Sequence, residues 1–272
     1  MILRKTLAAL FAVLAVTAAN AYRTDTVTVA AAGYLPEDMK VTVITPDRIP
    51  CTGAPSVYLL NGYGGDNGSW GIIRPDVGKF ADMYGMVLIM PSGMDLWYWD
   101  SPVKPEIRME SFFTDVLVPY IDKNYPTDAR AEKRAITGLS MGGHGGLWLG
   151  VRHPDIWKNC GSMSGGVNIL PFPKKWKMAR MLGEKEANPK IWEEHTVINL
   201  VPKMKAGVNN IIIDCGSEDF FAKVNADLHQ ALLDAKIPHD YTSRPGVHNS
   251  AYWANSLPYH LLFFQTKFAE VE

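Results

Sequence analysis

Short apolar runs alternate with helical patterns along most of the chain, and this alternation restricts the possible folds more than any other feature. The runs predict strands at 57–60, 86–90, 135–137, 160–164, 211–215 and 239–243. Apolar residues recur at helical spacing between the strands, in 76–84, 110–124, 141–152, 222–235 and 252–268. Buried strands that alternate with helices are typical of a mostly parallel sheet with helices on both faces. We therefore expect an α/β fold.

Two segments near the start differ from these buried strands. Segments 26–30 and 41–45 alternate polar and apolar residues, which predicts half-exposed antiparallel strands at the edge of the sheet. Pro119 interrupts the helical pattern of 110–124, so this helix should be kinked or should begin late. We expect residues 22–272 to form one domain.

The first twenty-one residues have the layout of a secretory signal peptide. Arg4 and Lys5 precede the apolar run 7–16, and Ala19-Asn20-Ala21 offers a cleavage site of small residues. The run is shorter than the roughly 20 residues of a membrane span, so we expect no stable span. The alternative is an uncleaved N-terminal anchor. The mature chain is expected to be exported, either to a periplasm or to the medium.

Charge and cysteine content exclude several classes of function. The net charge of −1 does not favour binding to nucleic acid or to an anionic membrane surface. Cys51, Cys160 and Cys215 allow one disulfide at most and leave one thiol, and the pairing stays open. The sequence has no CxxC, no HExxH and no His/Cys cluster with zinc spacing, so no metal site or cofactor is expected.

A glycine-rich segment, ITGLSMGGHGG, follows the predicted strand 135–137 and leads into a helix. It contains G-x-S-x-G, with Ser140 between Gly138 and Gly142. A serine on a sharp strand-to-helix turn needs small residues two positions to either side, because larger ones would collide with neighbouring backbone. Alternatively, the glycines only let the helix pack closely on the sheet. No Gly-Lys-Ser/Thr follows, which excludes a phosphate-binding loop. The context favours Ser140 as a nucleophile.

A serine nucleophile needs a base and an orienting carboxylate. In α/β folds with a serine on such a turn, the acid follows the serine along the chain and the histidine follows the acid. Asp219 lies in the turn after strand 211–215, whereas Glu218 would point elsewhere and Asp214 lies within the strand. Asp219 could also cap the next helix. His248 lies in a Gly/Pro loop between the last strand and the last helix, which is the position of the catalytic histidine in such folds. We expect a Ser140–His248–Asp219 triad.

An anionic intermediate on Ser140 would need backbone donors. The N–H of Met141, directly after the nucleophile, is the first candidate. The second should come from Asn61-Gly62-Tyr63-Gly64-Gly65, after strand 57–60. We favour Tyr63, with Gly64 as the other candidate. The alternative is a plain glycine-rich turn.

With these parts placed, four segments resemble the putative-esterase family of α/β-hydrolases: YLLNGYGGDNGSW, TGLSMGGHGGL, DCGSEDFF and RPGVHNSAYW. This family includes esterase D (S-formylglutathione hydrolase), feruloyl and acetylxylan esterases, and mycolyltransferases. The likeness extends over about 41–268. It implies an α/β-hydrolase fold and a serine carboxylesterase that works through an acyl-enzyme. The chain departs from the family at Asn61-Gly62, where His-Gly is usual, and at Gly246-Val247-His248, where Gly-Gly-His is common.

Aromatic residues near the expected cleft suggest how substrate is bound. Four tryptophans are candidate substrate contacts: Trp70, Trp97, Trp99 and Trp253. Ordinary packing of loops over the sheet is the alternative. Segment 165–207 is predicted to be an insertion that caps the cleft.

An exported enzyme of this kind suits a short-chain acyl, acetyl or feruloyl ester, either small or linked to a polysaccharide. An acyltransferase and a non-catalytic carbohydrate-binding protein are the alternatives. The sequence does not indicate the oligomeric state.

Overall fold

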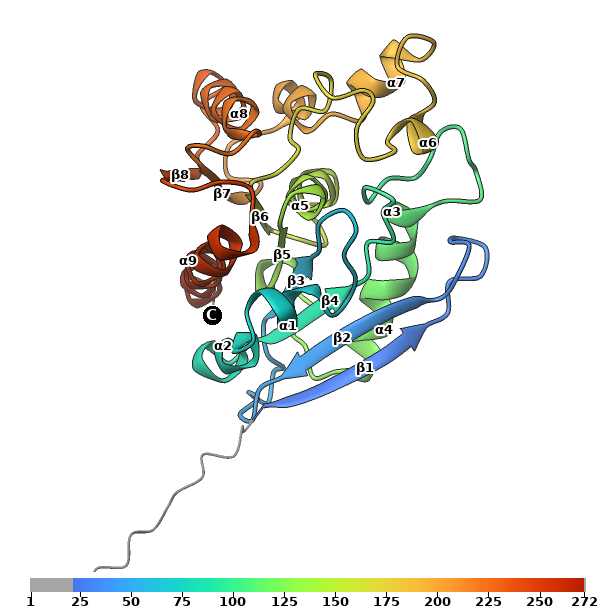
Figure 1. The fold of residues 1–272 in the computed structure, drawn as a ribbon. Helices are drawn as coiled ribbons and strands as arrows, with labels where there is room; N and C mark the ends of the chain where they lie inside the picture. The colour runs from blue at the N-terminus through green and yellow to red at the C-terminus, as the bar shows by residue number, and fades with distance from the viewer. Residues whose placement is uncertain (1–21, 272) are drawn as a thin grey trace, which may run out of the picture.

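The computed structural model describes residues 22–271, so the predicted signal peptide, 1–21, lies outside the described residues. Eight strands form one sheet in the order β1-β2-β4-β3-β5-β6-β7-β8 (Figure 1). Their bounds are β1 Arg23–Val29, β2 Met39–Thr45, β3 Ser56–Leu60, β4 Val87–Pro91, β5 Arg134–Gly138, β6 Asn159–Met163, β7 Asn210–Gly216 and β8 Asp240–Arg244. β1 and β2 pair antiparallel, β2 pairs antiparallel with β4, and every further pair is parallel. The mostly parallel sheet and its antiparallel N-terminal edge are confirmed.

Helices cover both faces of this sheet (Figure 1). One face carries α1 (Ser69–Ile73), α2 (Val77–Tyr84) and α9 (Ser250–Ala269), and the other carries α5 (Met141–Arg152), α8 (Ala222–Asp234) and the helix that contains α3 and α4. Successive residues of β3 point to opposite faces: Val57 packs with the α9 side and Tyr58 with the α5 side. Both faces are apolar because both are buried.

The helix with Pro119 is continuous but irregular. α3 (Met109–Phe112) runs into a π-helical turn, η1 (Phe113–Leu117), and then into α4 (Val118–Asn124). Pro119 has no N–H to donate to the carbonyl of Asp115, and the wider turn lies over this position. The irregularity expected from the proline is therefore present within one helix.

Segment 165–207 connects β6 to β7 and contains α6 (Ala179–Leu182), α7 (Pro189–Glu194) and a 3₁₀ segment, η3 (Val197–Lys203). Buried Met181, Leu182 and Trp192 join it to the core on the α5 side. All three cysteines are free: Cys51 is exposed, and Cys160 and Cys215 are buried. Among residues 22–271, no helix combines the length and the apolar character that a bilayer crossing requires.

Candidate active site

Ser140 occupies a strained turn between β5 and α5. Its backbone has φ 54° and ψ −115°, a conformation that residues other than glycine rarely adopt. A Cβ on Gly138 would lie 2.6 Å from the Leu60 carbonyl oxygen, and one on Gly142 would lie 2.5 Å from the same oxygen. The Ser140 N–H donates to the carbonyl of Met163 at 2.9 Å. The glycines therefore allow the close approach to β3 that the sequence motif predicts.

The structure brings Ser140, His248 and Asp219 together in one hydrogen-bonded chain. His248 Nε2 lies 2.9 Å from Ser140 Oγ, and Nδ1 lies 2.8 Å from Asp219 Oδ2. The Asp219 side chain is fully buried, and the His248 side chain is 13 % exposed. Asp219 Oδ1 also accepts the N–H of Phe221 at 2.8 Å, beside the start of α8. Asp219 can thus orient His248 and also satisfy backbone at the helix start. With the proton on Nδ1, Nε2 is free to accept the Ser140 proton.

The other candidate acids and bases are engaged elsewhere. Burial lowers the pKa of His144 and of His260 to about 3, so both are neutral imidazoles in the core. Asp214 is buried and accepts a hydrogen bond from Arg244, while burial raises its pKa to about 6. Glu218 is exposed to solvent. Within 22–271, Asp219 alone forms hydrogen bonds with His248 Nδ1.

Two backbone N–H groups close to Ser140 have no hydrogen-bond partner among the described residues. The N–H groups of Met141 and Tyr63 find no acceptor anywhere in 22–271, whereas the Gly64 N–H donates to Asp95 Oδ1 at 2.6 Å. The geometry therefore favours Tyr63 over Gly64 as the second donor. Asn61, where the family usually has histidine, is buried and accepts the Gly93 N–H at 2.8 Å.

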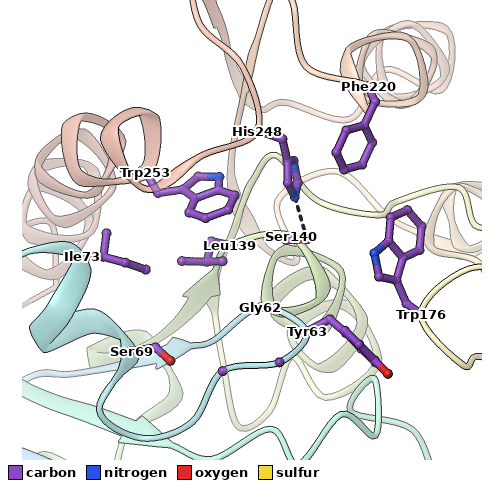
Figure 2. Close-up of a pocket in the computed structure, with 12 residues that line it drawn as sticks. Gly62, Tyr63, Ser69, Ile73, Leu139, Ser140, Trp176, Phe220, His248 and Trp253 are labelled. Atoms are coloured by element: carbon purple, nitrogen blue, oxygen red, sulfur yellow. Dashed lines mark hydrogen bonds between the residues drawn. The ribbon is translucent and has the colours of Figure 1, made fainter.

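A pocket of about 440 Å³ opens above Ser140 (Figure 2). Its walls come from the loop after β3, α1, the strand-to-helix turn at Ser140 (the elbow), segment 165–207, the loops after β7 and β8, and the start of α9. The lining residues are Gly62, Tyr63, Gly64, Gly65, Ser69, Ile73, Leu139, Ser140, Trp176, Phe220, His248 and Trp253. Figure 2 shows Ile73, Leu139 and Trp253 on one side of the Ser140–His248 pair, and Trp176 and Phe220 on the other. The Ser140 hydroxyl thus lies between two largely apolar walls.

The prediction of tryptophan contacts is wrong for three of the four residues. Trp70, Trp97 and Trp99 are at most 1 % exposed and do not line the pocket. The Trp70 indole donates to the carbonyl of Leu60, and that of Trp99 to His144 Nε2. These side chains pack the loops onto the sheet, which is the alternative given above. Trp253 does line the pocket.

The sequence analysis missed two aromatic residues of the pocket wall. Trp176 belongs to segment 165–207, and Phe220 directly follows Asp219. The centroid of the Phe220 ring lies 4.2 Å from the centroid of the His248 ring. The Phe220 ring is also stacked on the Trp176 ring, with centroids 5.8 Å apart. Its place beside the predicted acid was an available signal, whereas nothing local indicated Trp176. Among residues 22–271, no group of three or more His, Cys, Asp or Glu side chains could hold a metal ion.

Together, the fold and its likeness to known proteins define a serine hydrolase of the α/β-hydrolase type that acts on carboxylic esters. The chain belongs to the putative esterase family, whose model matches residues 32–264. It is 27% identical over 212 residues to an acetyl esterase of Caldicellulosiruptor saccharolyticus, covering 73% of this chain and 78% of that protein.

Other relatives carry the names of different hydrolase activities. The chain is 27% identical over 193 residues to an S-formylglutathione hydrolase of Bos taurus, covering 70% and 61% of the two chains. Among solved structures, a ferulic acid esterase superposes with a TM-score of 0.75 at 25% identity, over 90% of this chain and 99% of that one.

Proposed function

We propose that the protein is an exported serine carboxylesterase in which Ser140 is the nucleophile, His248 the general base and Asp219 the orienting acid. The observation that carries this proposal is the chain of contacts from Ser140 Oγ through His248 to Asp219, at 2.9 and 2.8 Å, at the floor of a pocket. Export rests on the pattern of residues 1–21 alone.

The reaction would proceed in two steps. His248 Nε2 takes the Ser140 proton as Oγ bonds to the ester carbonyl carbon, and the N–H groups of Met141 and Tyr63 stabilise the oxyanion. Each such donor contributes about 3 kcal/mol to the transition state. The intermediate then expels the alcohol, which receives the proton from His248. Water, activated by the same histidine, hydrolyses the acyl-enzyme.

The pocket supports a small or flat acyl group. Its volume of about 440 Å³ and its mostly apolar walls suit acetyl, other short-chain acyl or feruloyl esters. The relatives named acetyl esterase and ferulic acid esterase act on such groups by name. Esters linked to polysaccharides fit an exported enzyme better than a cytosolic thioester does.

The test is hydrolysis of p-nitrophenyl acetate, butyrate and octanoate and of methyl ferulate by residues 22–272, beside the Ser140→Ala variant. We expect activity that declines toward octanoate and is abolished in the variant. Equal inactivity of both proteins on all four esters would sink the proposal and favour a binding protein. Product analysis with added sugar acceptors would reveal an acyltransferase, because the acyl group would then appear on the sugar. N-terminal sequencing of the mature protein tests cleavage before Tyr22.

A further inference from the structure

Two histidines that the esterase chemistry does not use face each other at the edge of the sheet. His229 lies on α8 and His239 directly precedes β8, two elements at the same end of the sheet in Figure 1. His229 Nδ1 and His239 Nε2 are 2.7 Å apart, and both rings are partly open to solvent. His248 follows the opposite end of β8, so the pair is separate from the triad.

The surroundings hold both rings in place. His239 Nδ1 lies 2.8 Å from the Ile237 carbonyl oxygen, which can only accept, so the proton is on Nδ1 and the Nε2 lone pair points toward His229. The His229 ring is stacked on Tyr241 with centroids 4.2 Å apart and planes 10° from parallel. A backbone carbonyl on the far nitrogen, as at His239, is one of the partners by which proteins orient a metal-binding imidazole.

Proton balance also permits a ligand between the rings. Without one, the His229 Nδ1–H donates to His239 Nε2. If the His229 proton moves to its own Nε2, both inward nitrogens present lone pairs and both rings stay neutral. Partial burial and the neighbouring His239 lower the pKa of His229, which favours a neutral ring over the charged imidazolium.

We propose that His229 and His239 bind one divalent transition-metal ion, with water completing the coordination. Zn–N bonds of about 2.0–2.1 Å at a tetrahedral angle set two nitrogens roughly 3.3 Å apart, so the pair must open by about 0.6 Å. Rotation of two half-buried side chains can supply this. Imidazole selects Zn²⁺, Ni²⁺ or Cu²⁺ over Mg²⁺ and Ca²⁺. The ion would join α8, which follows Asp219, to β8, which precedes His248.

Calorimetric titration of chelator-treated protein with ZnCl₂, with MgCl₂ as the control ion, tests the site. The variants are His229→Asn and His239→Asn, and the matched control is His153→Asn, which removes a histidine paired with Glu110 at 2.7 Å. We expect one Zn²⁺ per chain, no Mg²⁺ binding, and an affinity about tenfold or more weaker in either pair variant but not in the control.

Thermal unfolding gives a second readout. Zn²⁺ should raise Tm in the native protein and in the control but not in the pair variants. Unchanged ester hydrolysis without metal would show that the variants are folded. The proposal is overturned by an absence of Zn²⁺ binding, by binding that survives in both pair variants, or by equal loss in the control.

Discussion

Asp95 offers a direct test of the oxyanion assignment, because it holds the loop after β3 but does not line the pocket. Its carboxylate accepts the Gly64 N–H at 2.6 Å and ties the loop after β3 to the loop after β4. Hydrogen bonds to charged groups contribute about 1.5–3 kcal/mol, and a solvent-exposed one belongs at the lower end. If Asp95→Ala frees this loop, the Tyr63 N–H loses its fixed position. A loss of about 1.4 kcal/mol in the transition state lowers kcat about tenfold.

The effect should appear in kcat and leave KM for p-nitrophenyl acetate nearly unchanged, since the oxyanion forms only during the reaction. Asp66→Ala is the matched control: Asp66 Oδ1 accepts the Gly68 N–H at 2.8 Å, another exposed carboxylate bond in the same loop but away from Tyr63. The reasoning is refuted if Asp95→Ala keeps the native kcat, or if both variants lose the same amount. Equal Tm values would exclude general destabilisation.

Three further changes probe the acid, the elbow and the buried His260. Asp219→Asn should lower kcat about 10⁴-fold, because an amide favours the wrong His248 tautomer. Hydrolysis of p-nitrophenyl acetate measures kcat, and a loss under tenfold would contradict the role of Asp219 as the orienting acid. Gly142→Ala should destabilise the fold by about 1–3 kcal/mol in urea unfolding, since its Cβ would lie 2.5 Å from the Leu60 carbonyl; unchanged stability would show that the elbow relaxes. The pKa of His260 is about 3 in the folded chain and 6.5 in the unfolded chain, so the unfolded chain takes up the proton first as the pH falls. The free energy of unfolding therefore decreases as the pH is lowered below 6.5. The loss at pH 5 is about 2 kcal/mol, and His260→Asn should flatten this dependence relative to the native chain.

The elbow was predictable because its requirements are local. Gly138 and Gly142 flank Ser140 in the sequence, and the same two glycines approach β3 in the structure. Asp219 and His248 followed from their order along the chain and their place after strands. Each of these signals depends on a few adjacent residues and on the direction of a parallel strand. Neither the adjacent residues nor the strand direction requires knowledge of tertiary contacts.

Tertiary contacts decide what the sequence left open. The choice of Tyr63 over Gly64 depends on Asp95, thirty-one positions away. Trp99 was predicted to contact substrate in the cleft, but its indole N–H donates a hydrogen bond to the buried His144 Nε2, forty-five positions away. Trp176 reaches the pocket only because of the path that segment 165–207 takes over the core. Long-range partners of this kind have no signature in a single sequence.

The departure at Val247 has a structural explanation in the pairing of β7 with β8. Because these neighbouring strands are parallel, the loops that carry Asp219 and His248 leave the same edge of the sheet, and the Glu218 N–H donates to the Gly246 carbonyl at 3.0 Å. Gly246 has φ 150°, and a Cβ there would lie 2.5 Å from the Tyr252 ring. Val247 is instead 44% exposed, so its side chain faces solvent. The position that needs glycine in this chain is therefore 246, and a branched residue at 247 leaves the contact between His248 and Asp219 intact.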